Sequence, residues 1–320
     1  VKGATVFIVQ AVVCTLLKQN AHIIAGVRQY SPTLPESITQ VELGDFADTP
    51  KPFNCLQDVA IIIHIAAREH IMNETVSNPL VEFRQVNTAG TLDLAKQAAQ
   101  AGVKRFIFIS SIKVNGEMTE PGTPFTAESM PLPIDPYGVS KYEAEQGLMA
   151  LVHETGMEVV IIRPPLVYGP GVKANFSAMI KWVNRSVPLP FGAINNQRSL
   201  VALENLVSFI MLCIDHPKAA NEIFLIADGE DVSTTQLLRK IAKALAKNSY
   251  LLPMPTRLMS FAAQLIGKGD IAQRLFSSLQ IDNSKARHLL DWHPAISMDQ
   301  QLQKIAKTYN KEHLKIHKKH

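Results

Sequence analysis

Short runs of apolar, often β-branched residues alternate with longer helical patterns through the first half of the chain. None of these runs shows the polar alternation of a half-exposed strand, so each predicts a strand that is covered on both faces of its sheet. The runs occupy residues 22–27, 59–64, 105–110 and 158–163.

Helical patterns separate the predicted strands, at residues 11–19, 86–101 and 137–154. Gly102 and Gly156 follow two of them, where a helix often ends in a left-handed residue. Repeated β-α-β units of this kind predict an α/β fold with a Rossmann-type, doubly wound parallel sheet and right-handed crossovers.

The pattern changes after Pro164, where proline and glycine become frequent and mostly helices follow, with one further strand at residues 222–227. We therefore divide the chain into a Rossmann domain of residues 1–165 and a smaller, mostly helical lobe of residues 166–320, some segments of which return to the first domain. A length of 320 residues, with 47% hydrophobic and 19% charged residues, suffices for both cores.

Charge and cysteine content exclude several classes of protein. The formal net charge is only +4, and the basic run at residues 311–320 is interpreted as a solvated tail, so no nucleic-acid partner is expected. Cys14, Cys55 and Cys213 have no CxxC spacing, which argues against a disulfide framework or a metal site and for the reducing cytoplasm. No apolar run reaches the roughly 20 residues of a membrane span, so no membrane insertion is expected. Val1 stands where a strand would end, so we expect residues before it.

Tyr137 and Lys141 form the first constellation that carries chemistry. They are four residues apart and share one face of the predicted helix. A nearby ammonium favours the phenolate, so it lowers the tyrosine pKa and allows proton exchange with a sugar or steroid hydroxyl near neutral pH. A surface helix pair is the alternative, but the position directly after a proline-rich loop favours catalysis.

Ser110 and Ser111 form the second constellation, at the carboxyl end of a predicted strand. In open α/β sheets this edge faces the ligand crevice, so a serine hydroxyl there can hydrogen-bond the reacting oxygen beside the tyrosine. An ordinary strand-end turn is the alternative interpretation.

The order and spacing of these segments resemble the extended short-chain dehydrogenase/reductases of the NAD-dependent epimerase/dehydratase family, in particular those that act on nucleotide sugars in the manner of UDP-glucose 4-epimerases. The likeness runs over nearly the whole chain. The matching segments are residues 2–9 at the dinucleotide loop, Gly44-Asp45, residues 65–67, residues 87–91, Ser110-Ser111, the Tyr137/Lys141 pair, residues 163–170 and residues 282–294.

The resemblance implies a role for each matching position, and it implies no metal site. Ser111, Tyr137 and Lys141 would be catalytic. The positions implied in binding NAD or NADP are Gly3, Thr5, Phe7, Ile8, Arg28, Asp45, Phe46, Ala66, Ala67, Asn87, Tyr137, Lys141 and Pro164. The positions implied in binding the nucleotide sugar are Ser111, Asn175, Phe176, Phe191 and Arg198, with core packing as the alternative for both phenylalanines.

The first glycine-rich segment departs from the family pattern T-G-x-x-G-x-x-G. Gly3 is present, but Val6 and Val9 occupy the second and third glycine positions. The second glycine lets the backbone approach the pyrophosphate, and the third permits close helix–sheet packing. Weakened cofactor binding, a shifted loop or a difference from the natural sequence would each account for the valines. We expect weaker cofactor affinity than in a Val6→Gly/Val9→Gly variant.

Three further positions bear on the reaction. Arg28 directly follows the predicted strand at residues 22–27, where an arginine can receive the 2′-phosphate of NADP(H); an exposed strand-end arginine is the alternative. Ile112-Lys113 stands where family dehydratases carry an acidic pair, so sugar dehydration is disfavoured. Leu166 replaces an asparagine of the family's epimerases, which removes one expected diphosphate contact.

Together these features predict an enzyme that transfers hydride at C4 of a nucleotide-linked sugar, with UDP as the expected nucleotide. Arg28 favours a 4-ketoreductase that uses NADPH once. A UDP-sugar 4-epimerase, which returns the hydride to the other face, is the alternative, and a non-catalytic nucleotide-binding protein is the second alternative. The resemblance also implies a homodimer through the helices at residues 87–101 and 137–154.

Overall fold

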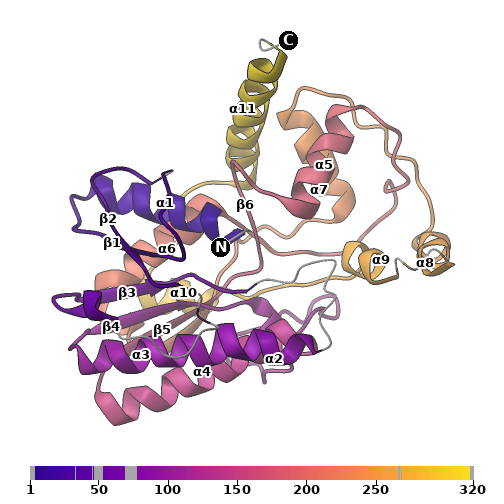
Figure 1. Ribbon diagram of the computed structural model, residues 1–320. Helices are drawn as coiled ribbons and strands as arrows, with labels where there is room; N and C mark the ends of the chain where they lie inside the picture. The colour runs from indigo at the N-terminus through magenta and orange to yellow at the C-terminus, as the bar shows by residue number, and fades with distance from the viewer. Residues whose placement is uncertain are drawn as a thin grey trace.

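The computed structural model describes residues 4–32, 34–44, 46, 53–68, 78–265, 267 and 269–317, which form an α/β body and a helical lobe (Figure 1). The strands are β1 (Ile24–Val27), β2 (Thr39–Glu42), β3 (Ile61–His64), β4 (Arg105–Ile109), β5 (Glu158–Arg163), β6 (Leu166–Tyr168), β7 (Leu200–Ala202) and β8 (Glu222–Leu225). The α-helices are α1 (Ala4–Lys18), α2 (Pro79–Phe83), α3 (Gly90–Gln100), α4 (Pro136–Thr155), α5 (Ala174–Asn184), α6 (Leu203–Asp215), α7 (Thr234–Ala244), α8 (Thr256–Leu265), α9 (Gly269–Phe276), α10 (Ser284–Leu290) and α11 (Met298–His317). Shorter helical segments are η1 (Asn54–Leu56), η2 (Arg84–Ala89), η3 (Ile112–Val114) and η4 (Pro217–Ala219).

The strands pair in parallel throughout. The main sheet has the order β3-β4-β5-β8, while β1 pairs with β2 and β6 pairs with β7. This arrangement confirms the predicted Rossmann-type α/β fold.

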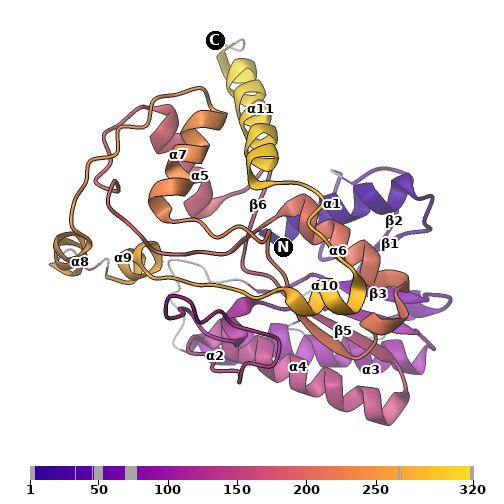
Figure 2. The same ribbon diagram turned by 180° about the vertical axis from the view of Figure 1, so that it is seen from behind.

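Helices cover both faces of the main sheet, which explains why the central residues of its strands are apolar. In β4, Phe106 and Phe108 belong to the core beneath α3 and α4, whereas Ile107 and Ile109 belong to the core beneath α1 and α6. All four side chains are buried, as alternation along a strand between two helix layers requires. Figures 1 and 2 show the two layers on opposite sides of the strands.

The predicted strands are all present, with ends that differ by at most two residues. The predicted helix at residues 137–154 is α4, and Gly156 follows it in the left-handed conformation, with φ of 73°. The short strands β6 and β7 escape prediction because three residues are too few to show a period.

The predicted start of the first helix is wrong. α1 begins at Ala4, so residues 4–9 are helical and do not form the expected loop. With valines at two of the family's glycine positions, no glycine interrupts the helical pattern after Gly3. Ile8, Val12 and Val13 are consequently buried along one side of a single helix.

The helical segment around Asn87 contains a π-helix that the sequence does not reveal. α2, the π-helix η2 and α3 follow one another from Pro79 to Gln100, whereas the pattern predicts a start at residue 86. π-helical turns are rare and frequently mark functional sites.

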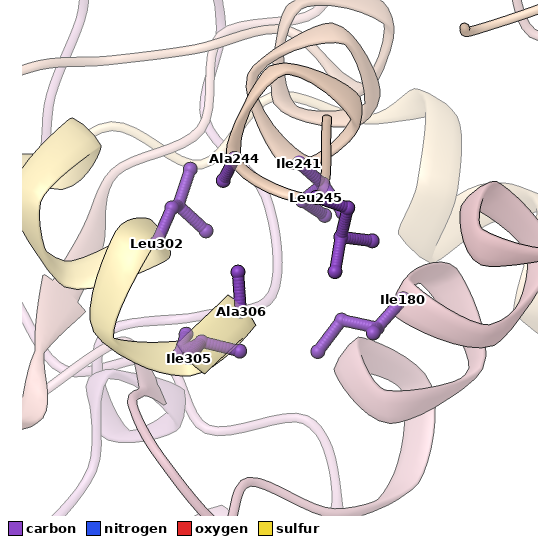
Figure 3. Close-up of a pocket in the computed structure, with 7 residues that line it drawn as sticks. All are labelled: Ile180, Ile241, Ala244, Leu245, Leu302, Ile305 and Ala306. Atoms are coloured by element: carbon purple, nitrogen blue, oxygen red, sulfur yellow. The ribbon is translucent and has the colours of Figure 1, made fainter. Parts of the chain in front are cut away.

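The lobe is built from α5, α7 and α11 around a second core. Figure 3 shows the small cavity that remains between these helices, which only aliphatic side chains line. Because the lining offers no hydrogen-bonding side chain, the cavity is a gap in packing and does not suit a sugar nucleotide. The lining residues are Ile180, Ile241, Ala244, Leu245, Leu302, Ile305 and Ala306.

Asp228, which follows β8, ties the lobe to the sheet. Its carboxylate accepts hydrogen bonds from the Tyr168 hydroxyl (2.5 Å), the Ala202 N–H (2.8 Å) and the Asn205 side-chain amide (2.7 Å). The Asn205 amide also donates to the Ile296 carbonyl at 2.9 Å. Burial raises the pKa of the Tyr168 hydroxyl, so Tyr168 remains a proton donor at neutral pH.

Within these described ranges, no helix has both the length and the apolar character that crossing a bilayer requires. Nor does the same part of the chain gather three or more histidine, cysteine, aspartate or glutamate side chains in a way that could hold a metal ion.

Candidate active site

The amino end of α4 is fixed by a cap and by a close backbone contact. Asp135 is the N-cap, and its carboxylate accepts a hydrogen bond from the Gly138 N–H at 2.6 Å. Pro136 occupies the first turn, where its missing N–H costs nothing. A Cβ on residue 138 would lie 2.8 Å from the Lys113 carbonyl oxygen, so only glycine fits there. Lys113 also forms an ion pair with Asp135, and these contacts together hold Tyr137 in place.

Lys141 lies one turn further along α4 and is 1% exposed. Its ammonium donates a hydrogen bond to the Ile109 carbonyl at 2.9 Å and lies 4.4 Å from the centre of the Phe108 ring. Both partners are at the carboxyl end of β4, so the helix brings the positive charge to the edge of the sheet where ligands bind in this fold.

Ser111 directly follows β4 and caps the short helix η3. Its hydroxyl accepts from the Lys113 N–H at 3.3 Å. The neighbouring Ile112 N–H donates to the Pro164 carbonyl at 3.0 Å, which joins the ends of β4 and β5. Ser111 therefore lies at the same edge as the carbonyl that holds Lys141.

Tyr137 lies half-buried beside this edge. Its ring meets Phe83 edge-on, with centroids 6.0 Å apart, and the Lys113 ammonium lies 6.0 Å from the ring centre. Because Lys113 belongs to the η3 helix that Ser111 caps, the three predicted catalytic residues come from neighbouring elements.

Asn87 connects three elements around the site. Its carbonyl oxygen accepts from the Arg68 N–H at 2.8 Å, and its amide donates to the Arg68 carbonyl at 3.1 Å and to the Ser140 hydroxyl at 3.0 Å. Ser140 in turn donates to the Tyr137 carbonyl at 2.8 Å. Through η2, Asn87 thus links the segment after β3 to the turn of α4 that carries Tyr137.

A buried ion pair lies behind the site, and the residues predicted from the sequence do not include it. Arg163 at the end of β5 and Glu145 on α4 are both 2% exposed and are joined by several hydrogen bonds. The Ser110 hydroxyl also donates to Glu145, and Arg163 donates to the Asn115 side-chain oxygen at 3.1 Å. A signal existed, because Glu145 stands four residues after Lys141 and Arg163 ends a strand of apolar residues.

His64, at the end of β3, is a second buried polar residue that the sequence does not single out. One ring nitrogen lies 3.0 Å from the Thr91 hydroxyl, and the ring stacks on Phe108. Burial, together with the charge of Lys141, lowers the pKa of His64 to about 3. His64 is therefore neutral at physiological pH, and the positive charge at this edge belongs to Lys141.

The predicted cofactor residues lie in different surroundings. Ala66 and Ala67 follow β3 and are half-buried, Pro164 follows β5 and is buried, and Arg28 is exposed at the end of β1. Phe46 packs against the Cα of Gly90, because a Cβ on residue 90 would lie 2.8 Å from its side chain.

The residues of the expected glycine-rich loop pack as a helix. Ile8 is buried in the core beneath α1, and Val9 packs against the same core. Phe7 lies against Gly169, since a Cβ on that glycine would be 3.1 Å from the Phe7 ring. Gly3 and Asp45 lie outside the described residues, and for Thr5 only the backbone, within α1, is described.

The carboxyl edge of the sheet suits a nicotinamide dinucleotide in three respects. α1 starts at Ala4 without an acidic residue in its first turn, and the free N–H groups of a helix start attract phosphate. Ala66 and Ala67 present small side chains after β3. Lys141 supplies a fixed ammonium at the end of β4.

The predicted substrate residues of the lobe divide into exposed and packed positions. Asn175 is exposed in the first turn of α5, whereas Phe176 is 1% exposed and stacks on Tyr168. Phe176 thus has the core-packing arrangement that the sequence leaves as an alternative. Phe191 is half-buried beside Trp182. The Arg198 guanidinium donates to the carbonyls of residues 274 and 277, at 2.8 and 3.1 Å, and burial lowers its pKa.

The sequence of the chain matches a family model and a characterised relative. The family model described as "NAD dependent epimerase/dehydratase family" matches residues 1–227. A UDP-glucose 4-epimerase of Vibrio cholerae is 44% identical over 308 residues, which cover 96% of this chain and 94% of that protein.

Solved structures share the fold over nearly the whole chain. A UDP-glucose 4-epimerase of Thermotoga maritima, crystallised with UDP-glucose, superimposes with a TM-score of 0.73 at 22% identity, covering 95% of this chain and 96% of the other. A short-chain dehydrogenase/reductase superfamily protein of Agrobacterium tumefaciens with bound NAD gives a TM-score of 0.76 at 20% identity, covering 97% and 96%. At these identities the likeness concerns the fold alone.

Proposed function

The chain belongs to the NAD dependent epimerase/dehydratase family and is an enzyme of the extended short-chain dehydrogenase/reductase type, and we propose that it is a 4-epimerase of a UDP-linked hexose. The observation that carries this proposal is the 44% identity to a UDP-glucose 4-epimerase over 96% of the chain. Arg28 taken alone favours a 4-ketoreductase, but this identity favours the epimerase.

Ser111, Tyr137 and Lys141 would perform the proton chemistry. Tyr137 would take the proton from the C4 hydroxyl of the sugar and return it later, because a positioned phenolate near a fixed ammonium can act as base and then as acid. Ser111 would donate a hydrogen bond to the C4 oxygen and hold it beside the phenol. Lys141, fixed by the Ile109 carbonyl, would supply the positive charge. A bound nicotinamide dinucleotide would accept the C4 hydride and give it back.

The removal and the return of the hydride differ only in which face of the sugar is turned toward the nicotinamide. Between them the sugar would turn so that the opposite face of C4 meets the hydride donor, while Tyr137 and Ser111 keep the same oxygen in reach. No net change in the cofactor's redox state follows, which distinguishes this reaction from a reduction.

We further propose NAD as the cofactor, held by the start of α1 and by Ala66, Ala67 and Lys141. A preference for NADP(H) at Arg28 is a separate hypothesis. Comparing dissociation constants for the two dinucleotides, in the unsubstituted protein and in Arg28→Ala, would test it. Equal changes for both dinucleotides in Arg28→Ala would contradict a role in phosphate selection.

We also propose that the protein forms a homodimer through the outer faces of α3 and α4. We propose that it works in the cytoplasm. Sedimentation equilibrium of the purified protein tests the dimer. A monomer at micromolar concentration would contradict it without affecting the assigned reaction.

The test of the reaction uses two substrates. We expect UDP-glucose to equilibrate with UDP-galactose, followed by NMR of the anomeric proton, without stoichiometric loss of NADH or NADPH. Stoichiometric oxidation of NADPH with a UDP-4-keto-6-deoxyhexose, and no isomer from UDP-glucose or UDP-N-acetylglucosamine, would instead identify a 4-ketoreductase.

A pair of tyrosine variants links the reaction to this site. Tyr137→Phe should reduce kcat by roughly 10²–10⁴-fold, the usual contribution of a general acid–base. Tyr142→Phe, five residues later on α4, is the matched control and should retain most activity. Equal losses in both variants would contradict the assignment.

A further inference from the structure

The outer part of the lobe carries an apolar stripe on α8. Leu258, Phe261 and Leu265 are 61%, 61% and 73% exposed. Their spacing of three and four residues places them on one face of the helix. Met259 is buried, and α8 packs against α9, so the helix is held with its stripe outward.

The segment before α8 adds to the apolar surface. The Leu189 N–H donates to the Tyr250 carbonyl at 2.9 Å, and the Leu252 N–H donates to the Leu189 carbonyl at 2.8 Å, which holds this segment extended. Leu251 packs against the lobe core, while Tyr250 and Leu252 on either side of it are exposed, as alternation requires.

Exposed apolar side chains are concentrated in this region. In the described part of the chain, seven of the sixteen large hydrophobic side chains with high exposure lie within residues 250–271. Single exposed hydrophobic residues are ordinary, but a concentration of this kind marks a surface that another phase or molecule covers.

Along the sequence, the segment that contains α8 carries basic residues without acidic ones. Residues 232–269 contain six lysines and arginines and no aspartate or glutamate. Lys240 is paired with Glu230 and Asp299, whereas Lys247 and Arg257, on either side of residues 250–255, are exposed. Apolar side chains together with the exposed Lys247 and Arg257 match an anionic lipid bilayer, which offers negative headgroups above an apolar interior. A second copy of this chain fits less well, because it would bring two basic surfaces together.

We propose that α8 and residues 250–255 form a docking surface for an anionic lipid bilayer. α8 would lie in the plane of the interface, with Leu258, Phe261 and Leu265 at the boundary between headgroups and acyl chains. Figures 1 and 2 both show α8 at the outer edge of the molecule, away from the main sheet and from α3 and α4. The bilayer therefore meets the lobe without covering the strands, and the docking is independent of the proposed epimerase reaction.

Flotation with vesicles tests this proposal directly. We expect the full chain to float with vesicles of phosphatidylcholine and phosphatidylglycerol and much less with phosphatidylcholine alone. The stripe variant Leu258→Ser/Phe261→Ser/Leu265→Ser should lose about tenfold or more of its binding, because it loses the apolar area that enters the interface. Circular dichroism should be unchanged, since all three side chains are exposed.

A second variant tests the contribution of charge to vesicle binding separately from that of apolar area. Lys247→Glu/Arg257→Glu should also lose about tenfold or more of its binding at low ionic strength, with a smaller difference at high salt. The matched control removes the same number of exposed hydrophobic side chains from other surfaces and should bind as the unsubstituted chain does. Its substitutions are Tyr30→Ser, Val81→Ser and Leu132→Ser.

Three results would overturn the proposal. The first is absence of flotation by the unsubstituted protein, and the second is an equal loss in the control and stripe variants. The third is a change from dimer to monomer in the lipid-free stripe variant by sedimentation equilibrium, because that result would assign the stripe to a second copy of the chain.

Discussion

The guanidinium of Arg163 and the carboxylate of Glu145 form a buried ion pair between the end of β5 and the middle of α4, with the Arg163 Nη2 atom 2.5 Å from the Glu145 Oε2 atom. Glu145 lies one helical turn beyond Lys141, and Ser110, which donates to it, precedes Ser111. The pair therefore holds the helix that carries Tyr137 and Lys141 against the strand end that carries Ser111.

Breaking this pair on one side should destabilise the protein strongly. Glu145→Leu leaves a buried guanidinium without its charge partner, and we expect the free energy of unfolding to fall by roughly 3–5 kcal/mol. The double variant Glu145→Leu/Arg163→Met should lose less than the sum of the two single variants, because no buried charge is then left alone. Urea denaturation measures all three changes.

An exposed pair of the same residue types provides the control. Arg84 donates to both carboxylate oxygens of Glu143 on the surface of the molecule. Glu143→Leu should shift the urea midpoint little, because water screens the charge that remains. A shift as large as that of Glu145→Leu would show that burial is not the cause.

Gly138→Ala should disturb the start of α4. The new Cβ would lie 2.8 Å from the Lys113 carbonyl oxygen and 3.0 Å from the Asp135 carboxylate, so the helix start or η3 must shift. We expect a loss of roughly 1–3 kcal/mol in stability, as for other overpacked sites, together with a lower kcat. Gly269→Ala is the control, because the nearest atom of the described residues would lie 3.5 Å from its Cβ. Unchanged melting and kcat in Gly138→Ala would contradict the contact.

His64 should make the protein less stable as the pH falls. Its pKa is about 3 in the folded state, against 6.5 when exposed, so below pH 6.5 the unfolded chain binds a proton that the folded chain does not. The stabilisation by neutral His64 is complete above pH 6.5 and is lost progressively toward pH 3. Between pH 6.5 and 5 the loss should be about 2 kcal/mol. Urea midpoints across this range should fall less steeply in His64→Gln, and an identical slope would rule out His64 as the source.

The three thiols should react with a disulfide reagent in order of exposure. Cys14 is exposed, Cys55 is half-buried and Cys213 is buried, and all three are free. Burial also raises the pKa of Cys213 to about 12, so it carries almost no thiolate at pH 8. We expect Cys14 to react first and Cys213 only after denaturation, as mass spectrometry of the labelled peptides would report. Labelling of Cys213 in the native protein would contradict its placement.

Local patterns in the sequence predict much of the fold and part of the candidate site. Tyr137 and Lys141 share a helical face because four residues make about one turn, and this depends on nothing distant. The strand β4 is predictable for a similar reason, since the four consecutive residues after Arg105 are all apolar and buried between two helix layers.

Features that depend on distant partners escape prediction. The π-helix η2 places Asn87 between the Arg68 backbone and Ser140, 19 residues before it and 53 after it. The helical start of α1 follows from its packing on the sheet and cannot be found by matching residues 2–9 to a glycine pattern. Arg163 is visible in the sequence as a charged strand end, but its partner Glu145 is identified only when α4 lies beside β5.

The hydrogen bonds that converge on Asp228 oppose a movement of the lobe relative to the main sheet. Tyr168 and Ala202 end β6 and β7, and Asn205 lies in the first turn of α6, so one carboxylate joins the two short strands to the start of α6. A clamshell motion of the whole lobe would break several buried hydrogen bonds at once. Rigid-body rotation of the lobe about β6 and β7 would therefore cost free energy, because these buried donors and the carboxylate would lose their partners.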